Sequence, residues 1–366
     1  MQKLKDIINF LETVAPLSLQ EGYDNSGLLY GDPESNIEKT IVSLDLTDAV
    51  LEEAINIKAQ LIIVHHPPVF KPIKRLSHYD QVSRMVIKTI QENIAIYAIH
   101  TNLDNVIWGV NGEIANRLGL KDLMVLSPLS NTHQKLIIYV PALHTEKVRN
   151  AVFAAGGGAI GNYSECSFSS KGIGTFKANV GSNPWTGKIG ERNEEAEEKL
   201  EFLIPVHLQA SILQEVQNSH PYETVAYDIV ALNNQFHEIG GGAIGRLNAP
   251  MPTELFLKEV KSIFGSAVIR HNGIEKREIS KVAICGGAGK SLINNALSKG
   301  ADAFLTADLS YHDFFVPPFK MLLADLGHFE SEQFTSELII SLVKEKFPNF
   351  AVLKTAIQTN PVHYFL

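Results

Sequence analysis

The chain has 366 residues, of which 45% are hydrophobic and 20% are charged, and this balance excludes a disordered or fibrous protein. At about 150 residues per domain, the length predicts two to three domains. The formal net charge of −8, without a run of Lys and Arg, argues against a general affinity for nucleic acid.

No segment approaches the roughly 18 consecutive apolar residues of a membrane span. The N-terminal residues 1–16 mix Lys, Asp and Glu with apolar side chains, which indicates an amphipathic helix rather than a signal peptide. The two cysteines, Cys166 and Cys285, cannot form a disulfide framework. We therefore expect a soluble cytoplasmic protein that binds no membrane.

Short apolar segments alternate with helical patterns in the first third of the chain. After an opening helix and a Gly-rich stretch (24–31), the expected elements are strands at 40–44, 61–64 and 94–99 and helices near 48–58 and 81–92. Strands separated by helices of about 10 to 14 residues predict βαβ units and a mainly parallel sheet.

The pattern changes near residue 135. The expected elements there are strands at 135–141, 166–178, 202–207 and 227–232, helices at 145–155 and 211–218, and an acidic stretch at 191–201. The resulting β-α-β-β-α-β order is typical of the split βαβ, or ferredoxin-like, fold.

The α/β alternation resumes after residue 240. The expected elements are strands at 282–285, 303–306 and 321–325, a helix at 291–299, and a long helix from His328 towards Lys346. The predicted fold class is an α/β body in two parts, interrupted by an inserted ferredoxin-like α+β domain. The expected boundaries are residues 1–128 and 237–366 for the body and 129–236 for the insert.

Two polar clusters follow apolar strands of the first part. His65 and His66 come directly after residues 61–64, and because successive strand residues point to opposite sides, the two imidazoles could serve different metals. The alternative is a pair of surface histidines on a turn. His100 and Asp104 follow residues 94–99; Asp104 could bridge two cations, or it could cap a helix or close a turn.

A third cluster opens the last helix. His328 and Glu332 are spaced i, i+4 and face the same side of a helix, which is how a helix presents two ligands to one metal site. The alternative is an acidic first turn with an incidental histidine. Asp308 and His312 follow the strand at 303–306 and could line the same cleft, although a helix cap equally explains Asp308.

All three clusters lie just past the carboxyl ends of predicted strands, where open α/β sheets bind their ligands. Three histidines and two carboxylates are enough for two metals if one carboxylate bridges them. Mixed imidazole and carboxylate ligands suit zinc, iron or manganese rather than calcium. The sequence therefore predicts a two-metal site that could activate a shared water.

Three other motifs are predicted to be structural. Residues 286–291 resemble a phosphate-binding loop, but Ile284 occupies the position of its first glycine, so tight packing is the expected role. GGGAIG occurs at 156–161 and at 240–245, and both copies are predicted to be turns. Cys285 has no identifiable base nearby and is predicted to belong to the core.

Several motifs occur in an order that resembles a known family. They are Asp24-Asn25-Ser26-Gly27, Ser43-Leu44-Asp45-Leu46-Thr47, His65-His66-Pro67, His100-Thr101-Asn102-Leu103-Asp104 and His328-x-x-x-Glu332. Together they resemble the GTP cyclohydrolase I type 2 homologues, or NIF-three-like proteins. The middle segment, with Gly161-Asn162-Tyr163 and His220-Pro221-Tyr222-Glu223, resembles the PII/CutA-like domain inserted in the long bacterial members.

The resemblance implies a dinuclear metal site. Its ligands would be His65, His66, Asp104, His328 and Glu332, holding two divalent ions per chain, with zinc expected and iron or manganese as alternatives. The resemblance also implies a toroidal homohexamer whose metal sites face an internal cavity.

The function expected from these observations is a metal-dependent hydrolase that acts on GTP, another nucleotide or another small molecule. His100 and His312 are the candidates for proton transfer or phosphate contact, and Asp104 is the expected bridge between the metals. The alternative is a metal-binding scaffold or regulatory protein without turnover.

Overall fold

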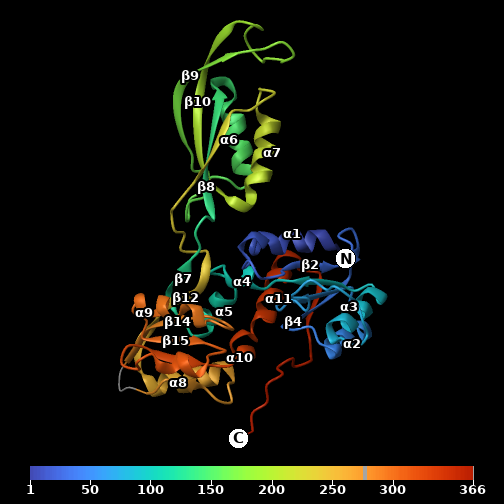
Figure 1. The fold of residues 1–366 in the computed structure, drawn as a ribbon, viewed down its shortest axis with the longest axis vertical. Helices are drawn as coiled ribbons and strands as arrows, with labels where there is room; N and C mark the ends of the chain where they lie inside the picture. The colour runs from blue at the N-terminus through green and yellow to red at the C-terminus, as the bar shows by residue number, and fades with distance from the viewer. Residues whose placement is uncertain (275–277, 366) are drawn as a thin grey trace. The chain divides into compact units, whose positions relative to one another are not determined.

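The computed structural model describes residues 1–274 and 278–365 and divides the chain into two compact units. Met1–Pro128 and His237–Leu366 form one unit, which we call the body, and Leu129–Phe236 form the other, which we call the insert. Figure 1 shows the elements of both units. Among the described residues, no helix combines the length and the apolar character needed to cross a membrane.

The first sheet of the body has the strand order β17-β4-β5-β6-β2. Its parallel strands are β17 (Ala351–Lys354), β4 (Lys39–Ser43), β5 (Leu61–Val64) and β6 (Ala95–Ala98), and β2 (Gly27–Tyr30) lies antiparallel to β6. The helices α2 (Asp48–Asn56) and α3 (Gln81–Gln91) connect β4 to β5 and β5 to β6. The predicted βαβ units are thus confirmed, whereas the Gly-rich stretch contains a strand that was not predicted.

The second sheet has the order β13-β16-β15-β14-β12-β7. The parallel strands are β14 (Glu278–Ile284), β15 (Ala303–Thr306) and β16 (Leu322–Asp325), and the antiparallel ones are β7 (Lys121–Pro128), β12 (Gly240–Pro252) and β13 (Arg270–His271). The predicted turn at 240–245 is wrong, because these residues open β12. A Cβ on Gly240 would lie 2.1 Å from the Ser127 carbonyl oxygen, so glycine here lets β7 and β12 approach closely.

One hydrophobic core joins the two sequence halves of the body. Leu4, Ile7 and Leu11 of α1 (Leu4–Val14) belong to the same buried cluster as Phe256 of α8 (Thr253–Phe264) and Val343 of α11 (Thr335–Lys346). The body is therefore a single unit despite the interruption in its sequence.

The long helix predicted from His328 to Lys346 is two helices, α10 (His328–Glu332) and α11. The Gln333 side chain separates them, because its Nε2 donates to the carbonyl oxygens of Glu330 and Phe264. The prediction of one continuous helix is wrong here, and the break leaves α10 as a short helical turn with Glu332 buried.

The insert forms one antiparallel sheet in the order β11-β8-β10-β9. Its elements are β8 (His133–Pro141), α6 (Thr145–Ala154), β9 (Phe168–Lys177), β10 (Arg192–Pro205), α7 (Gln209–Ser219) and β11 (Tyr227–Ala231). They follow the predicted β-α-β-β-α-β order. Val148 and Val152 of α6 and Ile212 and Val216 of α7 pack on Phe202 of β10 in a core separate from that of the body.

Two details of the insert also bear on the predictions. The acidic stretch 191–201 was expected to lie outside the strand at 202–207, but residues 192–205 form the single strand β10, and residues 206–208 form a 3-10 helix. Of the acidic residues of β10, Glu194 is exposed and Glu195, Glu197, Glu198 and Glu201 are half-buried. Glu201 is paired with Lys135 and Lys199. At 156–161 the predicted turn is confirmed, since Gly156, Gly158 and Gly161 all have positive φ.

Candidate metal centre

The carboxyl ends of parallel strands from both sheets open into one cavity of the body, with a volume of about 1010 Å³. His66 follows β5, His100 follows β6, and Asp104 ends the short helix α4 (Thr101–Asp104). His328 and Glu332 lie on α10, which follows β16 of the other sheet. The three clusters predicted from the sequence therefore meet in space, at the position where α/β sheets bind ligands.

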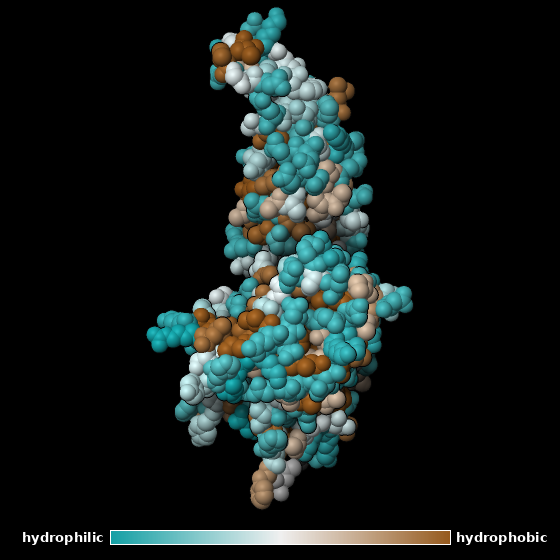
Figure 2. Space-filling view, turned by 90° about the vertical axis from the view of Figure 1, so that its right-hand side faces the viewer, coloured by the Kyte–Doolittle hydropathy of each residue, from teal (hydrophilic) through white to brown (hydrophobic). Residues whose placement is uncertain are grey.

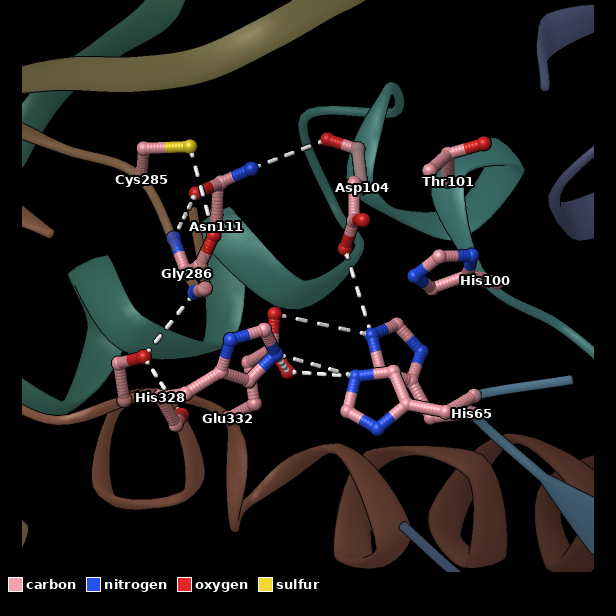
Figure 3. Close-up of polar contacts among 12 residues, drawn as sticks. His65, His100, Thr101, Asp104, Asn111, Cys285, Gly286, His328 and Glu332 are labelled. Carbon is pink, nitrogen blue, oxygen red and sulfur yellow. Dashed lines mark hydrogen bonds and ion pairs between the residues drawn. The ribbon is translucent and has the colours of Figure 1, made fainter. Parts of the chain in front are cut away.

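Nitrogen and oxygen donors of these side chains converge on one another (Figure 3). Glu332 Oε2 lies 3.0 Å from Nε2 of His66 and 3.0 Å from Nε2 of His328. The same two Nε2 atoms are 3.3 Å apart. His65 Nε2 lies 3.7 Å from Asp104 Oδ1 and 3.9 Å from Glu332 Oε1.

Each of four histidines is held at Nδ1 by an oxygen. The pairs are His65 with the Ile99 carbonyl (2.8 Å), His66 with Asp45 (2.8 Å), His100 with Asp24 (2.8 Å) and His328 with Asp308 (2.6 Å). A carbonyl oxygen only accepts, so Nδ1 of His65 carries the proton and its Nε2 presents a lone pair. Oxygen partners of this kind typically fix the tautomer and orientation of metal-binding imidazoles.

Two buried atoms of the cluster lack a hydrogen-bond partner among the described residues, namely His65 Nε2 and Asp104 Oδ1. Leaving a polar atom buried and unpaired costs about 1–3 kcal/mol. Both atoms can donate an electron pair, and they lie in the same group of donors. A bound cation would satisfy both, so the residues present fit a metal ion.

The carboxylates of the cluster also favour positive charge on their neighbours. Burial alone would lower the pKa of His66, but its hydrogen bonds to Asp45 and Glu332 raise that pKa to about 10. The pKa of His328 is raised to about 9, since hydrogen bonds to Glu332 and Asp308 outweigh burial. Without a metal, protons on these rings compensate the carboxylates.

The two buried carboxylates of the cluster differ in their electrostatic surroundings. Burial and the nearby Glu332 raise the pKa of Asp104. Burial would also raise the pKa of Glu332, but hydrogen bonds from His328 and His66 lower it well below its ordinary value. Glu332 is therefore the stable anion around which the imidazoles gather.

Donor atoms form three overlapping groups that could each hold a metal ion. In each group the donor atoms lie within 4.8 Å of one another, and the groups are His65, His66 and His100; His66, His328 and Glu332; and His65, Asp104 and Glu332. Every predicted metal ligand belongs to at least one of these groups.

The structure separates the two predicted catalytic histidines. The His100 ring lies 5.2 Å from that of His65, measured between centroids, and lines the cavity. His312 is exposed in a 3-10 helix, Tyr311–Phe315, stacks on Phe315, and is not among the cavity-lining residues. Asp308, which the sequence left open, lines the cavity and holds His328 rather than capping a helix.

The glycines of 286–291 have a packing role, as predicted. A Cβ on Gly287 would lie 2.3 Å from Glu332 Oε1, and one on Gly289 would lie 2.3 Å from Thr306 Oγ1. Cys285 also lies beside the cluster, where burial, Asp104 and Glu332 raise the pKa of its thiol. A protonated thiol is a poor nucleophile. The predicted place in the core is confirmed only in part, because Cys285 is half-buried, packs against a buried hydrophobic cluster and also lines the cavity.

Sequence reasoning assigned no role to three residues that shape the centre. Asp24 and Asp45 orient His100 and His66, and Thr359 Oγ1 donates to Asp45 Oδ2 at 2.8 Å. Asp45 lies two residues after the end of β4, as His100 does after β6, so the same positional signal was present. Thr359 lies far away in sequence, and no local pattern marks it.

Fold and site together define a class of protein. Its members have an α/β body that is interrupted in sequence by an inserted domain, and the body carries a candidate metal centre rich in histidines and carboxylates. The family model Duf34/NIF3 (NGG1p interacting factor 3) matches residues 2–361. The chain belongs to this family.

Relatives and solved structures agree with this assignment. A Halalkalibacterium halodurans protein named GTP cyclohydrolase 1 type 2 homolog is 38% identical, with 97% of each chain covered. A Bacillus subtilis protein of the same name is 35% identical, with 98% of this chain and 97% of the relative covered. The crystal structure of a Bacillus cereus protein related to NIF3 is 34% identical, with a TM-score of 0.86 and coverage of 100% of this chain and 99% of that one.

Proposed function

We propose that the protein is a hydrolase that works with two divalent cations held by His65, His66, Asp104, His328 and Glu332. The observation that carries the proposal is the convergence of their donor atoms, with His65 Nε2 and Asp104 Oδ1 buried and unpartnered. Imidazole and carboxylate donors suit zinc first, with iron or manganese as alternatives.

The donor groups suggest how the residues would share two ions. One group contains His65 and Asp104, the other contains His66 and His328, and Glu332 belongs to both. Glu332 offers Oε1 to the first and Oε2 to the second. Glu332 is therefore an alternative to Asp104 as the ligand that bridges the two metal ions.

The chemistry that such ions supply when bound is a lowered pKa of coordinated water, which makes a nucleophile available near neutral pH. The side chains and the carbonyl that bond to Nδ1 of each histidine orient the ligands. The cavity provides a half-buried space for the substrate. His100, held by Asp24 at 2.8 Å, is positioned for proton transfer. His312 is exposed and does not line the cavity, so it is too remote for that role.

The substrate to test first comes from the relatives, which are named GTP cyclohydrolase homologues. Hydrolytic opening of a nucleotide base ring is therefore the leading reaction, and GTP is the first compound to test. We also propose that the protein is a cytoplasmic homohexamer and that the insert is a PII/CutA-like domain. The strand order of the insert supports its assignment as a PII/CutA-like domain.

Exposed apolar surface supports self-association. Figure 2 shows hydrophobic patches among hydrophilic side chains on one face of the molecule. Tyr311 and Phe315, whose rings both contact that of His312, are 74% and 67% exposed. Exposed aromatic clusters of this kind are typical of surfaces that bind another protein.

The first experiment measures metal per chain in protein purified without added metal or a metal-binding tag. We expect about two equivalents, with the loss of at least one in Glu332→Gln and in Asp104→Asn, since each removes a charged ligand. His312→Asn is the control and should keep the full content. Absence of metal, together with no uptake on reconstitution, would contradict the metal centre.

Turnover separates the hydrolase from the alternative, a metal-binding scaffold or regulatory protein. The insert, which has its own core, is the observation that favours the alternative. Hydrolysis of GTP that stops on chelation and returns on metal addition would support the hydrolase. Metal binding without turnover of nucleotides, phosphoesters or cyclic amides would favour the scaffold.

A further inference from the structure

The cavity that contains the candidate metal centre has a large excess of negative charge. Besides Asp104 and Glu332, five further acidic residues line it, namely Glu21, Asp45, Asp308, Asp325 and Glu330. Arg270 is the one Lys or Arg among the described residues that line the cavity. A substrate that enters therefore meets carboxylates on most sides.

The charge of Arg270 is already compensated. Its guanidinium is paired with the buried carboxylate of Asp325 and donates to the carbonyl oxygen of Leu309 at 3.0 Å. It also lies 5.5 Å from the centroid of the Phe314 ring. Arg270 thus stabilises the wall of the cavity through these contacts, and it is poorly placed to bind several phosphate groups.

Bound metals would not reverse this balance. Seven carboxylates and one guanidinium line the cavity, and two divalent ions would add four positive charges. With neutral histidines the formal charge of the metal-loaded cavity is therefore −2. A triphosphate would therefore enter a cavity of like charge, and close like charges repel strongly where water is partly excluded.

Aromatic side chains offer a different kind of recognition at the same cavity. The rings of Tyr23 and Phe70 are stacked, with centroids 6.2 Å apart and planes inclined by 26°. Phe70 meets His100 edge to face at 5.9 Å. Tyr23 is 65% and Phe70 43% exposed, and both line the cavity, so a ligand can reach the parts of the two rings that do not face each other.

From the charge and the aromatic pair together, we infer that the cavity binds a planar heterocycle of low negative charge, a nucleobase or nucleoside rather than a nucleoside triphosphate. Its ring stacks on Phe70 and Tyr23 beside His100. Stacking on an aromatic side chain tolerates different bases because each has a π-face. The inference rests on the proposed function for what happens to the ring, but the binding that it predicts is measured without turnover.

The experiment is a calorimetric titration of the metal-loaded protein with guanosine, cytidine and GTP as probes. We expect at least one nucleoside to bind tenfold or more tightly than GTP. We expect Phe70→Leu to weaken that binding by about 5- to 100-fold, the usual range for loss of one stacked base. Tyr23→Leu, a second variant, should weaken it in the same direction.

Phe315→Leu is the control, because Phe315 is also an exposed phenylalanine but does not line the cavity. It should leave nucleoside binding unchanged. Tighter binding of GTP than of both nucleosides, binding of neither nucleoside, or unchanged affinity in Phe70→Leu would overturn the inference. Nucleoside binding without hydrolysis of any probe would instead count against the hydrolase alone, so the two failures are distinguishable.

Discussion

The orientation of each imidazole in the centre is determined by a residue outside the ligand set. His66 illustrates this, since Asp45 Oδ1 accepts from its Nδ1 at 2.8 Å while its Nε2 faces Glu332. A carboxylate in this position both fixes the ring and increases the basicity of the opposite nitrogen. The ligand set therefore depends on residues that touch no metal.

We predict that Asp45→Ala lowers metal affinity by about 10- to 100-fold, the usual cost of removing such a partner. Asp45→Asn should lower metal affinity by a smaller factor, because its amide oxygen can still accept the hydrogen bond from Nδ1 of His66. Some affinity should still be lost, because the amide carries no charge. Competition with a chromogenic chelator gives the affinities. Asp228→Ala, in the insert, serves as the control, and equal affinities in all four proteins would refute the role of Asp45.

At the scale of elements, the parts of the site that the sequence predicted share one property. β5, β6 and β15 are short apolar runs in which all four residues are buried, and the functional side chains come next in the chain. The hydrophobic pattern of the strands, and the position of the polar residues just after them, were therefore enough to predict where the clusters lie. The sequence could not reveal that His312 turns outward, because this depends on how Tyr311–Phe315 packs.

The C-terminal segment shows what local patterns cannot supply. β17 pairs with β4 in parallel, and the chain continues beside the end of β4, where Thr359 reaches Asp45. Asn360 Nδ2 donates to Glu330 Oε1 at 3.2 Å. This long-range pairing, across more than 300 residues, brings Asn360, Pro361, Val362 and Tyr364 to the cavity wall.

We predict that Thr359→Val lowers metal affinity severalfold, because the loss of one hydrogen bond to a carboxylate costs about 1.5–3 kcal/mol, of which part reaches His66 through Asp45. Thr359→Ser should keep the affinity of the wild type. Thr355→Val is the comparison, since Thr355 bonds to Glu53 instead of Asp45. The chelator competition would contradict this coupling if Thr355→Val and Thr359→Val lost affinity equally.

For the whole molecule, the main question is how far the body depends on the insert. Pro128, the last residue of β7, is paired with Gly240 of β12, so the chain leaves and re-enters the body at neighbouring positions of one hairpin. The buried cluster of the insert contains only residues of the insert. Each unit thus has the core and the closed chain path that independent folding requires.

We therefore predict that the body folds and takes up metal when residues 129–236 are replaced by a short Gly/Ser linker, because such a linker spans neighbouring strand ends at little entropic cost. The isolated insert should unfold in one cooperative transition of its own. Calorimetry of the full chain and both fragments tests this, together with metal content. A body fragment that folds but takes up no metal would show that the insert supports the centre itself, and one that fails to fold would show that the two cores stabilise each other.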